Sequence, residues 1–441
     1  MRGEFSSIEH NSFYVSFIIF FASFTLKLFY FMALDNPTPY PGDSFYYIHY
    51  ADNLIEHGVF SKDLSGSPVP DSYWAPGYPF FLAICLKAAN FLHIYFYPFT
   101  LLAQAVLSGA TVALTFLAGR FFLPAFYALA AALITAFSPH LMTLGGEILS
   151  ETLLGFLIML GIYCCLACFE RKHSFICWSV TGVVFGFAYL TNPTVLFFPV
   201  LFLLRQLWLL YSSNISLLSA KAIAVLAIFF VSIVLAWMVR DWVNVPANQS
   251  TTTDRAFENL VIGSHSQYHK MWRENPRDPN NPADMDLRQY KQDHAGFYQA
   301  FGGRLLSDPL HYAIWYFYQK PLDLWGWQIF VGRGGIFVSA PNSTLYDKSS
   351  VASTSLVVMK SMHYWLFGLA LAGFVFALRE SSFLKKESIL LLYMGLISIS
   401  AVYVVLHADA RYSVPMRPEM YLCAMYTIYK IVTSIKSKIT K

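Results

Sequence analysis

Asp43 is the residue whose type and position most clearly suggest chemistry. It stands in the run Pro-Gly-Asp-Ser-Phe-Tyr-Tyr, a few residues after a long apolar segment. A carboxylate at a partly dry interface gains basicity and can accept a proton from a hydroxyl group, which is the work of a general base. The alternative is structural, because an aspartate at this position could cap a helix over 44–57.

Aromatic residues accompany this carboxylate in the sequence. Tyr46 lies in the same run, and Tyr78 lies in the rigid run Trp-Ala-Pro-Gly-Tyr-Pro over 74–79. A membrane protein has little reason to place an acid, aromatic rings and a Pro/Gly turn in one loop unless that loop handles a polar substrate at the bilayer edge. Tyr46 and Tyr78 are therefore candidates for substrate binding.

Glu147 and Glu151 are two further acidic residues, at the start of another apolar segment. Residues four apart share one face of a helix. Ionisable groups near the membrane interior are costly and usually functional, although a carboxylate at a helix N-terminus can also simply complement the helix dipole. Glu151 lies deeper in the segment and is the better candidate for catalysis.

Two arginines stand where few positive charges are expected. Arg240 ends an apolar segment in Trp-Met-Val-Arg-Asp-Trp, and Arg411 lies in Asp-Ala-Arg-Tyr. Guanidinium groups bind phosphate oxygens bidentately, so both are candidates for a phosphate clamp. The alternative is that they are snorkelling anchors. Lys320 is a further substrate-binding candidate, and Arg417 is expected to pair with Glu419.

A divalent metal would need ligands that the sequence offers weakly. His265 and His269 are spaced i, i+4, with Glu258 upstream. On a helix this pattern could bind a metal, but two histidines in a polar loop are more often solvated. No metal site is therefore predicted, and no cofactor is expected to be required.

The composition is that of a membrane protein. Of 441 residues, 56% are hydrophobic and 13% are charged, whereas a soluble domain has about 25% charged residues. This predicts an all-α polytopic membrane protein and gives no reason to expect a nucleic-acid partner. The polar segment 241–355 contains none of the six cysteines, so no disulfide framework is expected.

About 20 apolar residues are needed to cross the hydrocarbon core. This criterion predicts about ten transmembrane helices, over 13–34, 98–119, 124–143, 149–169, 174–191, 194–211, 220–239, 356–378, 388–406 and 414–430. The apolar run 77–96 is better interpreted as a juxtamembrane helix, because a crossing there would turn most later basic clusters outward.

With 77–96 on the surface, most of the basic residues at the ends of the spans share one side, which the positive-inside rule makes cytoplasmic. They are Arg2, Arg120, Arg171, Lys172, Arg205, Lys221, Arg379, Lys385, Lys386 and the tail Lys430–Lys441.

The predicted organisation has three parts: a transmembrane catalytic module over 1–240 with its first outer loop at 35–97, a long outer loop over 241–355, and C-terminal transmembrane helices over 356–441. The expected location is the bacterial inner membrane, with the site facing the periplasm.

Several runs together resemble one known family. They are GDSFYYIHYADNLIEHGVFS, WAPGYPFFLA, LSETLLGFLIMLG, AWMVRDW and ARYSVPMRPEMYLCA. The chain resembles the GT-C superfamily of membrane glycosyltransferases, in particular its protein O-mannosyltransferases and lipid A aminoarabinose transferases. The resemblance is weak through 250–355. Many relatives carry two adjacent acids in the first outer loop, whereas Asp43 is followed by Ser44.

The resemblance implies an inverting transfer of a hexose or pentose from a polyprenyl-phosphate sugar to a hydroxyl group of a lipid, protein or polysaccharide. It makes Asp43 the catalytic base and Glu151 the second acid, with Arg240 and Arg411 on the phosphate of the sugar donor. The alternatives are a flippase or transporter, or a ligase, of lipid-linked glycans. No internal repeat of the transporter kind is evident.

Overall fold

The computed structural model describes residues 2–36, 42–170, 174–212, 220–275, 278–330 and 335–439, without the side chains of 2–11 and 170. The described residues form helices and isolated β-bridges, with no sheet. Seven described helices are long and apolar enough to cross a membrane: Ser12–Ala33, Phe96–Gly119, Glu151–Phe169, Pro193–Ser212, Ala220–Asn244, Ser350–Leu378 and Phe383–Val405. The predicted class, an all-α polytopic membrane protein, is confirmed.

Each of the ten predicted spans coincides with a helix. The long helices are α1 (Arg2–Ala33), α4 (Phe96–Gly119), α7 (Glu151–Glu170), α9 (Phe197–Ser212), α10 (Ala220–Asn244), α18 (Ser350–Leu378), α19 (Phe383–Val405) and α21 (Arg417–Ile439). Two others are shorter apolar helices, α5 (Ala125–Phe137) and α8 (Phe175–Thr191). The short 3₁₀ helices η1 (Pro193–Leu196) and η3 (Val414–Met416) precede α9 and α21.

The predicted span 124–143 is interrupted. Ser138 has an extended backbone (φ −62°, ψ 115°), and Pro139 begins the next helix, α6 (Pro139–Leu144). A proline disfavours the helical conformation of the residue before it and donates no backbone hydrogen bond. The helix therefore ends within the predicted segment.

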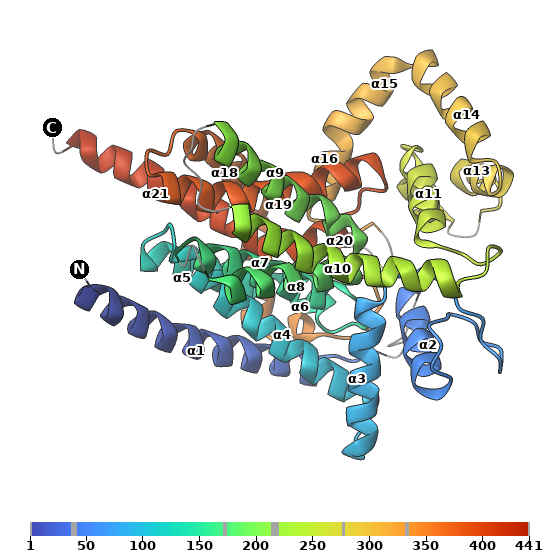
Figure 1. Cartoon of the computed structure of the whole chain (residues 1–441), viewed down its shortest axis with the longest axis horizontal. Coiled ribbons are helices and arrows are strands. Elements are labelled where there is room, and N and C mark those ends of the chain that lie inside the picture. Colours follow the sequence, from blue (N-terminus) through green and yellow to red (C-terminus); the bar gives the residue numbers. More distant parts are fainter. Residues whose placement is uncertain are drawn as a thin grey trace.

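The two ends of the bundle differ (Figure 1). Both chain termini lie at one end. The opposite end, here called the outer end, carries α2 (Asp43–Glu56), α3 (Gly77–Phe91) and the helices of the long outer loop. Helix α3 runs crosswise to α1 and α4, and its 15 residues span about 22 Å, too short to cross the hydrocarbon core. This agrees with the juxtamembrane interpretation of 77–96.

The long outer loop is more helical than its Pro- and Asn-rich sequence suggests. It contains α11 (Thr252–Gly263), α12 (Tyr268–Glu274), α13 (Pro282–Tyr290), α14 (His294–Ser307), α15 (Pro309–Ile314), the π-helix η2 (Trp315–Gln319), α16 (Lys320–Leu324) and α17 (Leu345–Lys348). Phe257, Val261 and Phe297 form a small core of their own here. The loop is thus a folded cap over the outer end.

A second hydrophobic core, separate from that of the bundle, joins the first outer loop to the turn before α7. It contains aromatic residues of α2 and α3 together with Ile148 and Leu149. Aromatic side chains bury large areas and stack in defined geometries. The outer loop and the start of α7 are therefore held in a fixed relation, on which the site depends.

One covalent link contradicts the expectation from composition. Cys168 near the end of α7 and Cys177 near the start of α8 form a disulfide, with Cα atoms 5.9 Å apart. The two helices are neighbours in an antiparallel hairpin, a proximity that cysteine counting cannot reveal. Of the predicted cytoplasmic basic residues, Arg171, Lys172, Lys441 and the side chain of Arg2 lie outside the described residues.

Candidate active site

Asp43 is the first residue of α2. The helix is entered through Gly42, whose φ of +55° suits glycine, and the helix has no side-chain cap. The Asp43 carboxylate is thus not used to cap α2. Instead, Asp43 Oδ2 accepts a hydrogen bond of 2.9 Å from Nη2 of Arg411, 368 residues away in the sequence.

Glu151 begins α7, after a tight turn that other residues hold in place. Gln104 of α4 donates to the backbone carbonyls of Gly145 and Glu147, both at 2.9 Å. Tyr78 is fully buried and donates to Gln104 Oε1 at 2.7 Å. Tyr78, predicted to bind substrate, therefore lies behind the site and supports the turn that leads to Glu151.

Arg411 lies on the short helix α20 (Ala410–Ser413). Asp409 caps this helix, because its Oδ1 accepts from the backbone N–H of Arg411 at 2.8 Å and its Oδ2 accepts from that of Phe330 at 2.8 Å. The Arg411 Nε donates to Glu151 Oε1. One guanidinium therefore bridges the two carboxylates that the sequence analysis selected.

The bridge is electrostatically strong. The side chains of Arg411 and Glu151 are each 7% exposed, and that of Asp43 is 32% exposed. Burial acts to lower the pKa of Arg411, but the charges of Glu151 and Asp43 outweigh it, and the pKa lies well above its ordinary value. The arginine is charged at all physiological pH values.

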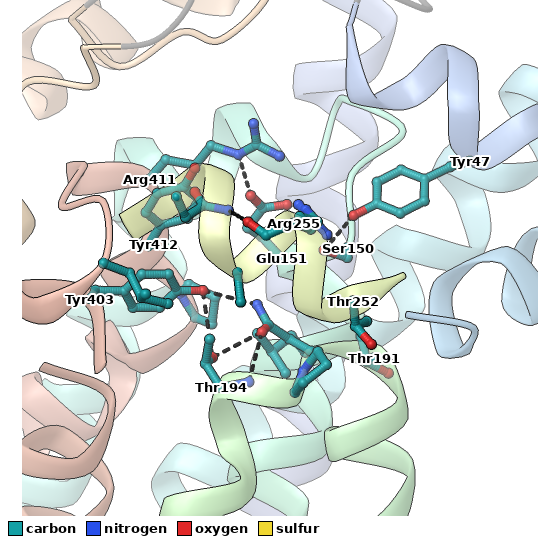
Figure 2. A pocket seen from close by; sticks show the side chains of 17 residues that line it. Tyr47, Ser150, Glu151, Thr191, Thr194, Thr252, Arg255, Tyr403, Arg411 and Tyr412 are labelled. Carbon is teal, nitrogen blue, oxygen red and sulfur yellow. Dashed lines mark hydrogen bonds and ion pairs between the residues drawn. The ribbon is translucent and has the colours of Figure 1, made fainter. Parts of the chain in front are cut away.

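A small cavity of about 130 Å³ adjoins Glu151 and Arg411 (Figure 2). Most of its polar lining is neutral and comes from α2, the residue before α7, the end of α8, the Asn192–Thr194 segment, α11, α19 and α20. In the floor, Asn192 donates to the Tyr403 hydroxyl at 3.0 Å and Thr194 donates to Asn192 Oδ1 at 2.9 Å. The neutral polar residues of the lining are Tyr47, Ser150, Thr191, Asn192, Thr194, Thr252, Asn259, Tyr403 and Tyr412.

Arg255 is the second cation of this cavity, and the sequence analysis missed it. It follows the capping box of Thr251 and Asp254 at the start of α11. Its guanidinium carbon lies 3.4 Å from the centre of the Trp74 ring. Within the described part of the chain, no carboxylate lies within ion-pair distance of Arg255. The sequence signal that could have identified Arg255 was this capping box, which marks the start of a helix in the long outer loop.

A wider cavity of about 1020 Å³ lies on the other side of Asp43. Asp43, Tyr46 and Trp74 line it, together with residues of the long outer loop. The Asp43–Arg411 and Trp74–Arg255 contacts each join a residue of the wide cavity to a residue of the small one. We call these two pairs the partition, because each links the lining of one cavity to that of the other.

Two predicted cations lie elsewhere. Arg240 donates to the carbonyls of Asp71 (2.9 Å) and Phe60 (3.0 Å) and pairs with Asp241. It thereby ties the first outer loop to α10.

Lys320 is fully buried and donates to the carbonyls of Leu406 (2.6 Å) and Val405 (3.3 Å), at the end of α19. Desolvation lowers its pKa to about 7. Lys320 and Arg240 line neither cavity.

Arg417 does not pair with Glu419 as expected. It is fully buried, donates to the carbonyl of Gly326 at 3.0 Å and lies 2.7 Å from Nδ1 of His140. The histidines considered for a metal also have separate contacts: His265 with Asp286, and His269 with the carbonyl of Ala408. The described residues contain no group of three or more His, Cys, Asp or Glu side chains arranged to hold a metal.

Comparison with solved structures identifies the fold. The apo oligosaccharyltransferase of Archaeoglobus fulgidus is 12% identical, with a TM-score of 0.52 over 97% of this chain and 52% of that chain. The chain shares the fold of that enzyme, which supports the resemblance to the GT-C superfamily. The chain spans about half the length of that enzyme.

Two further structures are similar at lower scores. The Archaeoglobus fulgidus oligosaccharyltransferase AglB with an inhibitory peptide and a dolichol-phosphate has 11% identity and a TM-score of 0.46, over 97% of this chain and 51% of that chain. Apo ArnT from Cupriavidus metallidurans has 13% identity and a TM-score of 0.36, over 96% and 77%. Neither a family model nor a curated protein matches the sequence.

Proposed function

We propose that the chain is a membrane glycosyltransferase that moves a sugar from a polyprenyl-phosphate donor to an acceptor hydroxyl group at the outer end, with inversion. The observation that carries the proposal is the bridge of Asp43, Arg411 and Glu151 between two cavities. The GT-C fold supports it, as do the sequence runs around these residues.

Asp43 is the proposed general base. An acceptor in the wide cavity reaches Asp43, whose Oδ2 is held by Arg411 while the rest of the carboxylate is available for a proton. The acceptor oxygen forms a bond to the anomeric carbon, its proton passes to Asp43, and the bond from that carbon to the phosphate oxygen breaks. A single displacement of this kind inverts the anomeric centre.

Arg255 is the proposed phosphate ligand, in place of Arg240. The leaving polyprenyl phosphate departs with the bonding electron pair and needs a cation to stabilise its charge. Arg411 is already shared by two carboxylates, whereas Arg255 contacts the face of Trp74 and no carboxylate among the described residues. Its guanidinium can therefore bind phosphate oxygens.

Purified protein in lipid nanodiscs, given radiolabelled undecaprenyl-phosphate glucose and a membrane extract as acceptor, tests this function. We expect loss of label from the lipid and its appearance in another molecule or as free sugar. In vesicles, movement of intact donor between leaflets without bond cleavage would instead establish a flippase. An intact, unmoved donor would refute both activities.

A further inference from the structure

Glu151 has an oxygen that the bridge leaves unused. Its Oε1 accepts from Arg411, while its Oε2 is buried and has no hydrogen-bond partner among the described residues. The whole residue is 6% exposed and lines the small cavity. Buried polar atoms are nearly always hydrogen-bonded, so an unpaired carboxylate oxygen in a cavity indicates a ligand that donates a hydrogen bond.

The ligand portion that lies against Glu151 Oε2 is not the phosphate, which is proposed to lie at Arg255. Phosphate oxygens only accept hydrogen bonds at neutral pH, and they would face an oxygen that also only accepts. The neutral hydroxyl and amide groups of the lining, including Asn192, Thr194 and Tyr403, suit a group that both donates and accepts. A sugar ring has this character.

The size of the cavity limits what it holds. A protein cavity of about 150 Å³ accommodates one six-membered ring such as benzene. The small cavity measures about 130 Å³, and the partition joins its lining to that of the wide cavity. It therefore has room for one sugar ring and not for two.

We infer that Glu151 is a specificity-determining residue: its Oε2 accepts a hydrogen bond from a hydroxyl or amino group of a single donor sugar, and its charge excludes acidic sugars. This inference rests on the proposed function. It gives Glu151 a role in binding the sugar, beside its role in holding Arg411, and it adds no further proton-transfer step to the reaction.

Equilibrium binding tests the inference without an acceptor. The protein in nanodiscs is titrated with undecaprenyl phosphate and with its glucosyl and glucuronosyl forms, which differ by a carboxylate in place of a hydroxymethyl group. We expect the glucuronosyl lipid to bind at least about tenfold more weakly than the glucosyl lipid, because its carboxylate would face the buried Oε2 of Glu151, a negatively charged oxygen that can only accept hydrogen bonds. A cellobiosyl form should also bind more weakly.

Glu151→Gln separates recognition from folding. The amide oxygen still accepts from Arg411, but the amide nitrogen donates to a sugar carboxylate, so the preference for the glucosyl lipid should shrink several-fold. Unmodified undecaprenyl phosphate should bind this variant nearly as well as wild type, which reports an intact fold. Glu147→Gln is the matched control, because Glu147 lies in the turn just before Glu151 but lines neither cavity.

Each outcome decides something different. Equal affinity of wild type for the glucosyl and glucuronosyl lipids, or a preference unchanged in Glu151→Gln, overturns the role of Glu151. Equal binding of the cellobiosyl lipid overturns the single-ring limit. Failure of wild type to bind any of the lipids refutes the proposed function itself, and this inference with it.

Discussion

The two cavities beside Asp43 differ in volume and in the elements that line them. The small one measures about 130 Å³ and is lined mainly by helices of the bundle, whereas the wide one measures about 1020 Å³ and is lined mainly by the outer loops. A small polar cavity suits one defined group, and a wide one admits substrates of varied shape. The difference supports our proposal that the sugar of the donor binds in the small cavity and the acceptor in the wide one.

The partition is where the two substrates would meet. Asp43 faces the wide cavity, and Arg411 and Glu151 face the small one. A base on the acceptor side and cations on the donor side are what an inverting displacement requires. The comparison therefore predicts that variants on each side affect one substrate each, and that variants of the partition affect the reaction.

The largest effect is expected from Asp43→Asn. The amide keeps the size of the side chain but cannot accept the acceptor's proton, so the rate of transfer should fall by about 10²–10⁴-fold. Binding of the polyprenyl-phosphate sugar should change little. Initial rates with radiolabelled donor measure the first effect, and titration measures the second.

Asp52→Asn is the control for that experiment. Asp52 lies on the same helix as Asp43 but lines neither cavity, so its variant should transfer at nearly the wild-type rate. A rate for Asp43→Asn within tenfold of wild type would remove the general base from the mechanism.

Arg255→Ala should have the next largest effect, on the donor. Loss of charge-assisted hydrogen bonds to the phosphate should raise the KM for the donor by about 10–100-fold. Arg255→Lys should recover part of the loss because the charge remains. Donor titrations at saturating acceptor measure these values.

Arg240→Ala is the matched arginine variant. Arg240 holds backbone carbonyls of the first outer loop, so its removal should lower thermal stability more than donor affinity. The assignment of the phosphate to Arg255 fails if Arg240→Ala raises the donor KM more than Arg255→Ala does.

The helices and part of the site were predictable from the sequence. Hydrophobic segments predicted the ten helices, because the thickness of the bilayer sets their length. The distribution of basic residues predicted that 77–96 does not cross, and the short, crosswise α3 agrees with this. Asp43, Glu151 and Arg411 were selected because they are charged residues next to predicted spans, and the fold brings all three together. The sequence marks these positions because few charged residues stand at the span ends on this side, whereas most basic residues lie on the other.

Side-chain direction was not predictable in this way. Arg240 sits at a span end like Arg411, yet its guanidinium turns to carbonyls of a loop about 170 residues earlier in the chain. Arg255 lies in a loop whose fold depends on long-range packing. Tyr78 supports Gln104 from behind the site because α3 crosses the outer end, which no local pattern specifies.

Two variants with smaller effects, one on the acceptor and one on the donor, should distinguish the two cavities. Tyr46→Ala removes an aromatic wall of the wide cavity and should raise the KM for the acceptor by about threefold to tenfold, with donor affinity unchanged. Tyr403→Phe removes one hydroxyl from the floor of the small cavity and should weaken donor binding by about fivefold, with the acceptor KM unchanged. A loss of donor affinity in Tyr46→Ala, or a raised acceptor KM in Tyr403→Phe, would contradict the assignment of the cavities.

The smallest effect concerns stability and pH, and it involves neither cavity. Burial raises the pKa of Glu147 to about 7 from its ordinary 4.5, although the backbone N–H of Ser339 donates to this carboxylate. The folded protein therefore holds a proton that the unfolded chain releases between these values. Stability from this group is full below about pH 4.5 and is lost as pH rises through 7.

The melting temperature of wild type should accordingly fall more between pH 5 and 7.5 than that of Glu147→Gln, which cannot titrate. The difference corresponds to at most about 1.4 kcal/mol per pH unit. Lys320, whose pKa is lowered to about 7, acts in the opposite direction and above pH 7, where stability rises as the unfolded chain stays protonated. If the melting temperatures of wild type and Glu147→Gln change equally between pH 5 and 7.5, Glu147 is already ionised in the folded protein at pH 5 and its pKa is not raised.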